Sequence, residues 1–255
     1  MKFAAVTTYA PQHWESHARR CVETFRQHWG GILLEEFKDA DLEANSTWLA
    51  EFKRRHAHRP TADYRMDAVR FAHKIAAIDL AHESSAADVL IWIDADCVTH
   101  APVDATWLAG LIKDGDFAYL RRTMKYPECG FMMFRRNERG GMFIDAIVQA
   151  YRSDALFALP EWHDSFVIDH VRATRERLGM LRCVSLSGQA ERTHHPLING
   201  PLGAKLDHLK GPRKVLGRSR PADLKVVRTE AHWAGMRDER RQEIKRRIPP
   251  RRRTV

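Results

Sequence analysis

The clearest sign of the fold is the segment Val89-Leu90-Ile91-Trp92-Ile93-Asp94-Ala95-Asp96. Its first five residues form an unbroken apolar run, which is typical of a parallel strand covered by helices on both faces. Two carboxylates follow where the strand ends, and ligands gather at that end of the strands in sheets of this kind. The segment therefore predicts both the class of fold and the place of a polar site.

Strand and helix patterns alternate on either side of this strand. Apolar strand patterns cover residues 3–8, 32–37, 117–120, 130–134 and 180–186, and helical spacing of apolar residues covers 11–29, 42–56, 65–82, 141–152 and 165–178. From Ser187 onward the pattern becomes irregular, and no internal repeat is visible. The alternation predicts an α/β fold, a Rossmann-like domain with a mostly parallel central sheet flanked by helices.

Length and composition set the class of protein. The chain has 255 residues, of which 44% are hydrophobic, and a formal net charge of +9. These values are ordinary for a globular protein and favour one large domain, alone or with a small appendage. The longest apolar runs are too short to span a bilayer, and residues 1–9 fit a first strand better than a signal peptide. We therefore expect a cytoplasmic protein with no transmembrane segment.

The cysteines give no sign of a zinc ribbon or a redox dithiol. Cys21, Cys97, Cys129 and Cys183 are far apart, and no two of them form a C-x-x-C pair. We expect four reduced thiols.

Positive charge is concentrated towards the C-terminus. Residues 201–255 hold 17 Lys or Arg and 6 Asp or Glu, whereas residues 1–200 are close to neutral. We expect a domain over residues 1–220 and a basic extension over 221–255. Such a segment attracts phosphate groups, nucleic acid or an acidic membrane surface, and the alternative is a solvated tail that aids solubility.

Asp94 and Asp96 are the first candidates for chemistry. Two carboxylates one residue apart at a strand end can share a divalent cation, and oxygen ligands suit Mg²⁺ or Mn²⁺. Two other Asp-x-Asp pairs occur, but Asp114-Gly115-Asp116 fits a turn and Asp39-Ala40-Asp41 leads into a helix. We therefore predict the metal at Asp94-Ala95-Asp96. The alternative is a loop that uses aspartate only for its turn.

Two basic motifs accompany the acidic pair. Asp67, Arg70 and Lys74 share one face of the predicted helix, because they lie at positions i, i+3 and i+7. The stretch from His208 to Lys214 has the form H-x-x-G-x-x-K. Its imidazole can bind a metal, its glycine lets backbone amides approach a phosphate, and its lysine can neutralise that phosphate. The plainer alternatives are an ion-paired surface of a helix and a turn in a basic region.

In this order, the elements resemble glycosyltransferases of the GT-A fold, which are single α/β domains that bind a nucleotide-sugar. The matching elements are Thr7-Thr8-Tyr9, the helix of residues 65–74, Asp94-Ala95-Asp96, and the motif of His208, Gly211 and Lys214. The last motif resembles that of the glycogenin-like and lipopolysaccharide-galactosyltransferase-like branch. The small glycosyltransferases of bacteriophage genomes are resembled by the stretch from Tyr64 to Lys74 and by Asn199-Gly200-Pro201-Leu202-Gly203 followed by Asp207-His208-Leu209-Lys210-Gly211.

The resemblance implies a role for each matching residue. Asp94, Asp96 and His208 would hold Mn²⁺ or Mg²⁺. The donor, expected to be a UDP-sugar, would contact the residues Thr7, Thr8, Tyr9, Arg65, Asp67, Arg70, Lys74, Asp94, Ala95, Asp96, Gly211 and Lys214. Because Lys214 is followed by Val215-Leu216 and not by the Pro-Trp of the glycogenin-like branch, the retaining stereochemistry of that branch is not carried over.

The middle of the chain is expected to supply the acceptor side. Asp164, at the start of a predicted helix, is the predicted general base if the enzyme inverts, and Glu128 is the second choice. Tyr126 and Trp162 are the predicted acceptor contacts. The alternatives are a helix N-cap for Asp164 and core packing for Trp162. The pair His194-His195 receives no role.

The sequence thus predicts a metal-dependent glycosyltransferase that moves a sugar from a nucleotide-sugar to a hydroxyl group. A hydroxymethylated base in phage DNA fits the segment 237–255, which holds nine Arg or Lys and three acids. A lipid-linked or surface saccharide is the alternative acceptor. A nucleotidyltransferase ranks behind, because residues 7–11 contain no glycine-rich loop. A non-enzymatic nucleic-acid-binding protein would leave Asp94-Ala95-Asp96 without a purpose.

Overall fold

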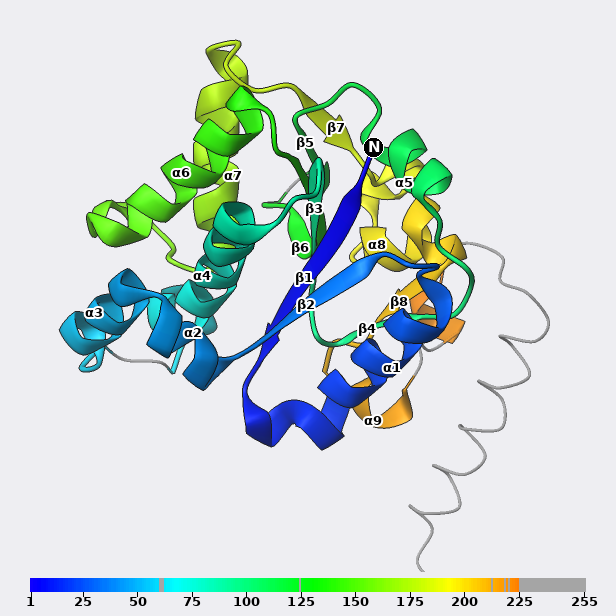
Figure 1. Cartoon of the computed structure of the whole chain (residues 1–255), viewed down its shortest axis with the longest axis horizontal. Helices are drawn as coiled ribbons and strands as arrows, with labels where there is room; N and C mark the ends of the chain where they lie inside the picture. Colours follow the sequence, from blue (N-terminus) through cyan, green and yellow to red (C-terminus); the bar gives the residue numbers. More distant parts are fainter. Residues whose placement is uncertain (60–61, 124, 212, 218, 220, 225–255) are drawn as a thin grey trace, which may run out of the picture.

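The centre of the molecule is a six-stranded sheet with the strand order β2-β1-β3-β6-β5-β7. A computed structural model describes residues 1–59, 62–123, 125–211, 213–217, 219 and 221–224 (Figure 1). The strands are β1 (Phe3–Tyr9), β2 (Leu33–Lys38), β3 (Val89–Ile93), β5 (Phe117–Leu120), β6 (Glu128–Arg135) and β7 (Cys183–Ser185). The bounds of β3 and β5 agree with those predicted from the sequence.

One strand of this sheet runs against the others. β1 pairs in parallel with β2 and β3, and β5 pairs in parallel with β7, but β6 is antiparallel to both β3 and β5. The prediction of an α/β fold with a mostly parallel sheet is confirmed. The reversal of β6 has a consequence for the site, because its first residues lie at the same edge as the ends of β1 and β3.

Helices cover both faces of the sheet (Figure 1). On one side lie α4 (Ala68–Ser84), α6 (Glu138–Arg152) and α7 (Asp164–Arg177), with α2 (Asp39–Asn45) and α3 (Thr47–His56) beyond them; on the other lie α1 (Arg19–His28) and α5 (Ala105–Ile112). All five residues of β3 are buried. Leu90 and Trp92 belong to the core on the α4 side, and Val89, Ile91 and Ile93 to the core on the α1 side. The unbroken apolar run therefore reflects a strand covered on both faces.

The predicted helices are broken at polar residues that cap them. The stretch 42–56 is divided at Ser46, whose hydroxyl accepts from the Leu49 amide at 3.4 Å and caps α3. The stretch 65–82 is divided at Asp67, which caps α4. Residues 11–29 are helical, but they pass through a 3-10 turn and a π-helical turn before α1. Capping side chains satisfy free amides at helix starts, so a helix can begin anew at each of them.

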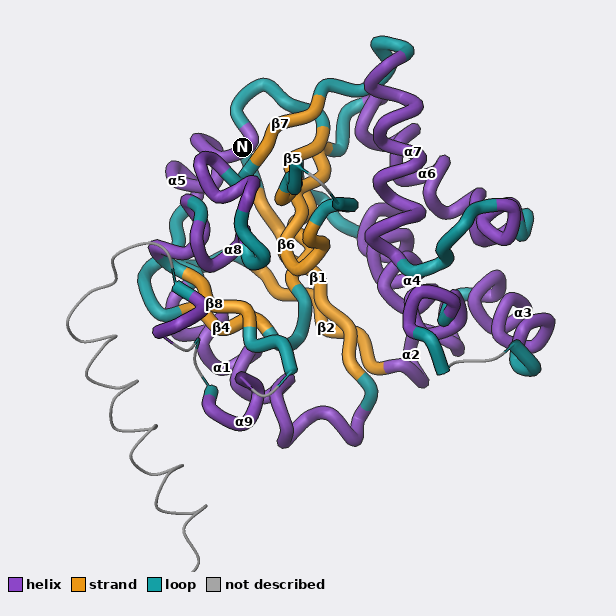
Figure 2. The backbone as a smooth tube through the Cα atoms, turned by 180° about the vertical axis from the view of Figure 1, so that it is seen from behind, coloured by secondary structure: helices purple, strands orange, loops and turns teal. Residues whose placement is uncertain are grey.

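A second, two-stranded sheet lies beside the first (Figure 2). β4 (Cys97–Thr99) pairs antiparallel with β8 (Leu206–His208), and Cys97 lies opposite His208. The expectation of irregular chain after Ser187 is wrong in part, because this region also contains the short helices α8 (Pro196–Asn199) and α9 (Arg213–Leu216). Strands of three residues carry too little periodicity to be found from sequence.

Of the predicted basic extension over 221–255, residues 225–255 lie outside the described part of the chain. Within the described part, no helix combines the length and the apolar character needed to cross a membrane. Cys21, Cys97, Cys129 and Cys183 are free thiols, as expected.

The buried position of β3 can be tested with two leucine substitutions. Leu90→Ala empties space in the core and should lower the free energy of unfolding by about 2–5 kcal/mol. Leu33→Ala, on the edge strand β2 where Leu33 is 63% exposed, should change it by less than about 1 kcal/mol. Urea unfolding followed by circular dichroism measures both values. Equal losses in the two variants would contradict the placement of β3.

Candidate active site

A cleft of about 1120 Å³ opens where β1 and β3 end. The start of β6, the start of α7 and the end of β8 close its other sides. Twelve of the residues predicted to act at the site line this cleft: Thr8, Tyr9, Arg70, Lys74, Asp94, Ala95, Asp96, Tyr126, Glu128, Asp164, His208 and Lys214. Segments far apart in the sequence thus meet at one edge of the sheet, as expected for an α/β fold.

Three donor side chains converge at the base of the cleft. The Nε2 atom of His208 lies 3.0 Å from Oδ1 of Asp96 and 3.6 Å from Oδ2 of Asp94. Trp92 donates its indole N–H to the other oxygen of Asp94 at 2.7 Å, which orients that carboxylate. Two carboxylate oxygens and an imidazole nitrogen are a donor set that suits Mn²⁺ or Mg²⁺. The residues predicted as metal ligands are therefore together.

β4 and β8 bring His208 to this place. The backbone of Asp94 donates to the carbonyl of Gly130 at 2.9 Å, and Leu209 donates to the carbonyl of Asp96 at 2.8 Å. The main chain on both sides of the acidic pair is thus hydrogen-bonded to β6 and to the chain that leaves β8. His208 is 2% exposed and lines the cleft.

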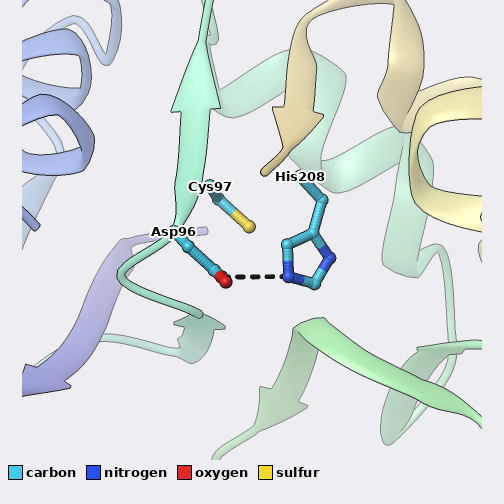
Figure 3. Close-up of side chains that lie close together, drawn as sticks. All are labelled: Asp96, Cys97 and His208. Atoms are coloured by element: carbon cyan, nitrogen blue, oxygen red, sulfur yellow. Dashed lines mark hydrogen bonds and ion pairs between the residues drawn. The ribbon is translucent and has the colours of Figure 1, made fainter. Parts of the chain in front are cut away.

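Cys97 lies close to the same point but is a poor ligand. Ligand atoms of Asp96, Cys97 and His208 lie within 4.8 Å of one another (Figure 3). The thiol of Cys97 donates to the carbonyl of Gly130 at 3.5 Å, and burial raises its pKa well above the usual range. Because metals bind the thiolate and not the thiol, this cysteine stays outside the donor set.

Lys74 connects the acidic pair to Asp164. Its ammonium group lies 2.8 Å from Asp94, forms an ion pair with Asp164 and donates to the carbonyl of Cys129 at 3.1 Å. Burial acts against the charge of both partners, but their mutual attraction outweighs it: the pKa of Lys74 is raised and that of Asp164 is lowered. A carboxylate held in this way is a weak proton acceptor. In this arrangement Asp164 anchors Lys74.

Lys214 pairs with Asp96, the second carboxylate of the acidic pair: its ammonium nitrogen lies 3.1 Å from a carboxylate oxygen of Asp96. Burial works to raise the pKa of Asp96, but His208 and Lys214 outweigh it and hold the pKa below its usual range. Asp96 is therefore ionised, which is the state needed to bind a cation.

Two predicted donor contacts that precede α4 in the chain do not line the cleft. The guanidinium of Arg65 turns away and pairs with Asp63 at 2.6 Å. The carboxylate of Asp67 accepts from the amide of Arg70 at 3.1 Å and caps α4. Both are local contacts of residues two or three apart, and such contacts compete with a ligand for the side chain.

Three more predicted residues are also absent from the lining. Thr7 lies in β1, and its side chain is fully buried. Trp162 packs edge-on against Phe157 at 5.0 Å between ring centroids, which is the core-packing alternative named above. Gly211 has a φ of +57°, so it forms a turn that favours glycine.

The structure adds lining residues that sequence reasoning missed. Basic side chains of the cleft that were not predicted are Arg122, Lys125, Lys210, His13, His17, His73, His163, His194 and His195. Arg122 and Lys125 follow β5, so the rule that ligands gather at strand ends could have identified them. The pair His194-His195, which received no role, lies in the cleft wall. Burial and the nearby Arg213 lower the pKa of His195 to about 4.

The likeness of this chain to known proteins lies in its structure. No protein-family model matches the chain, and no curated protein matches it. Among solved structures, the chain is similar to the crystal structure of a glycosyltransferase involved in the glycosylation of the major capsid of PBCV-1. The two share 9% sequence identity with a TM-score of 0.49, over 84% of this chain and 96% of that chain. Identity at this level says nothing of the substrates of this chain, which have to be inferred from the cleft.

The Lys74–Asp164 pair can be tested by Lys74→Met in metal-free buffer. The variant leaves Asp164 buried without its cation, which should cost about 3–5 kcal/mol of unfolding free energy at neutral pH. In the wild type the lowered pKa of Asp164 contributes stability above its unfolded pKa, and this is lost as the pH falls. In the variant that contribution is absent, so the difference in unfolding free energy between the wild type and Lys74→Met should shrink in acid.

The double variant Lys74→Met/Asp164→Asn is the control, because it removes the stranded charge and should recover part of the loss. Urea unfolding between about pH 2 and pH 7, a range that spans the carboxyl pKa of about 3.9 in the unfolded chain, measures all three proteins. A loss in Lys74→Met that does not depend on pH would contradict the ion pair.

Proposed function

We propose that the protein is a metal-dependent glycosyltransferase that takes a sugar from a nucleotide-sugar and transfers it to a hydroxyl group. The observation that carries this proposal is the convergence of Asp94, Asp96 and His208 at the base of one large cleft. Lys74 on α4 lies beside Asp94, and Lys214 on α9 lies beside Asp96. A site of this kind can hold a diphosphate together with a divalent cation.

Asp94, Asp96 and His208 would hold Mn²⁺ or Mg²⁺ through two oxygens and one nitrogen. When bound there, the cation would stabilise the diphosphate leaving group as its negative charge develops. The protein adds fixed positive charge from Lys74, Lys214 and Arg70, all of which line the cleft. Preorganised charges of this kind stabilise a transition state at little cost in reorganisation.

The nucleoside would lie at the end of β1. Thr8 donates its hydroxyl to the carbonyl of Phe37 at 2.9 Å, and the Tyr9 hydroxyl lies 3.2 Å from Glu36. These contacts tie the end of β1 to β2 and make a fixed wall against which a base can pack. UDP-sugars are the donors we expect, because the resemblance to GT-A enzymes favours them.

The acceptor would approach past Tyr126. This residue lines the cleft and also a second hollow of about 390 Å³ along α7. Its ring packs on that of His163, with 4.4 Å between centroids, and its hydroxyl lies 3.0 Å from that of Tyr64. In the proposed reaction Lys74 exchanges Asp164 for a donor phosphate oxygen, which leaves the Asp164 carboxylate free to accept the proton of the acceptor hydroxyl.

The donor class can be tested by thermal unfolding with UDP, GDP, CDP, ADP and UDP-sugars, each with Mn²⁺ or with EDTA. One nucleoside diphosphate should stabilise the protein only when metal is present, by about 2.7 kcal/mol at a hundred times its Kd. Asp96→Asn should abolish this gain. Asp114→Asn, at the exposed first position of another Asp-x-Asp pair, is the matched control and should keep it.

Stabilisation by a nucleotide in EDTA, or by none of the ligands, would contradict the proposal.

Product analysis then separates two enzyme classes. A glycosyltransferase releases the nucleoside diphosphate, whereas a nucleotidyltransferase releases pyrophosphate.

Hydroxymethylated DNA is the acceptor we propose to test first, since the basic segment 237–255 suits a polyanion. Turnover on DNA should fall steeply as salt rises from about 50 to 200 mM, because bound phosphates release counterions. Turnover on a neutral saccharide should change little over the same range. Salt-insensitive turnover on DNA, or turnover on saccharide alone, would reject the DNA acceptor in favour of the saccharide.

A further inference from the structure

Glu128 is a buried carboxylate surrounded by positive charge. Its side chain is 1% exposed at the start of β6. One oxygen lies 2.7 Å from Nδ1 of His208 and 3.2 Å from the ammonium of Lys210, and the other lies 3.5 Å from a guanidinium nitrogen of Arg122. The backbone amide of Leu197 also faces this second oxygen at 3.5 Å. Both oxygens of the carboxylate therefore face donors.

We propose that Glu128 is a positioning residue for the metal site, which holds the His208 ring with Nε2 directed at Asp94 and Asp96. The two ring nitrogens of a histidine are coupled: a carboxylate that accepts from Nδ1–H leaves Nε2 as the nitrogen that can bind a metal. The carboxylate also makes that nitrogen more basic. This inference rests on the proposed function, because it assumes a cation at the three donors.

This role replaces the one predicted from the sequence, in which Glu128 was the second choice for the general base. Burial alone would raise the pKa of Glu128, but Lys210, His208 and Arg122 outweigh it and hold the pKa well below its usual range. A carboxylate that is saturated with donors and stays ionised has no reason to take a proton from a substrate.

Gly130 forms the other side of the slot that holds the ring. It lies two residues after Glu128 on β6, so the two positions share one face of the strand. A Cβ atom at residue 130 would lie 2.3 Å from Cε1 and 2.5 Å from Nδ1 of His208. Because no real contact is that short, any larger residue would displace the ring from Glu128. The imidazole of His208 is thus held by the carboxylate of Glu128 at Nδ1 and by the backbone of Gly130, which has no side chain, beside the ring.

The same carboxylate places two cations on the cleft wall. Lys210 leaves β8 two residues after His208, and Arg122 comes from the loop after β5. Both line the cleft. Glu128 therefore links the metal ligand on β8 to the basic loop after β5, and its loss should disturb the metal site first, since the His208 contact is the shortest.

The test is Mn²⁺ binding to the full-length protein, measured by the loss of the free-ion signal in electron paramagnetic resonance. Glu128→Gln keeps the shape but removes the charge and should weaken Mn²⁺ binding about 10- to 100-fold. Asp39→Asn, which neutralises another carboxylate lining the same cleft, is the matched control and should bind Mn²⁺ as the wild type does. Equal affinity in Glu128→Gln and the wild type would overturn the proposal.

Gly130→Ala supplies a second variant that leaves every carboxylate intact. It should push the ring aside and weaken Mn²⁺ binding at least as much as Glu128→Gln does. Circular dichroism of each variant without metal shows whether it is folded. If Glu128→Gln fails to fold, unchanged Mn²⁺ affinity in a folded Gly130→Ala would overturn the proposal.

A readout without metal separates this inference from the proposed function. In the ¹⁵N-histidine-labelled protein, the His208 ring resonances are assigned by their loss in His208→Gln. They should shift in Glu128→Gln and stay in place in Asp39→Asn. If the wild type binds neither Mn²⁺ nor Mg²⁺, the proposed function fails, whereas unshifted ring resonances in Glu128→Gln would show that Glu128 does not hold the ring.

Discussion

The arrangement of the site depends on the pairing of two very short strands, β4 and β8. Cys97 lies opposite His208 in this pair, so the residue after Asp96 fixes a histidine more than a hundred positions away in the sequence. Backbone hydrogen bonds from Asp94 to β6 and from Leu209 to Asp96 extend the pairing on both sides. Without these main-chain contacts, the acidic pair would be a flexible turn and the imidazole would have no defined place.

Charge balance is the second constraint on the site. Asp94, Asp96 and Asp164 form ion pairs with Lys74 and Lys214, and all five residues line the cleft. Burying a charge is costly unless it is paired, so the lysines stabilise the carboxylates in the state without ligand. In the proposed function, the same lysines would neutralise a diphosphate once the carboxylates hold a cation. One set of side chains thus serves both the stability of the fold and the proposed chemistry.

The sequence predicted the parts of the site that follow strong periodic patterns. The bounds of β3, and the place of the two carboxylates just after it, were predicted correctly, because a buried strand has an unmistakable apolar run. The direction of β6 and the existence of β8 could not be predicted, since pairing partners distant in the chain decide them and short strands carry little pattern. Arg65 was placed in the site because residues 65–74 resemble the basic helix of GT-A enzymes, but its guanidinium pairs with a local partner, Asp63, outside the cleft. The position of His195 depended on how the chain after Ser187 packs, which periodicity does not specify.

In the proposed function, His208 and a nucleoside diphosphate meet on one cation. Pulsed electron paramagnetic resonance of the protein with Mn²⁺ and UDP tests it directly, because nuclei bound to the ion couple to its electrons. The spectrum should contain a ¹⁴N coupling from one imidazole, lost in His208→Gln, together with a ³¹P coupling from the diphosphate. A spectrum with neither coupling, or a ¹⁴N coupling that persists in His208→Gln, would contradict it.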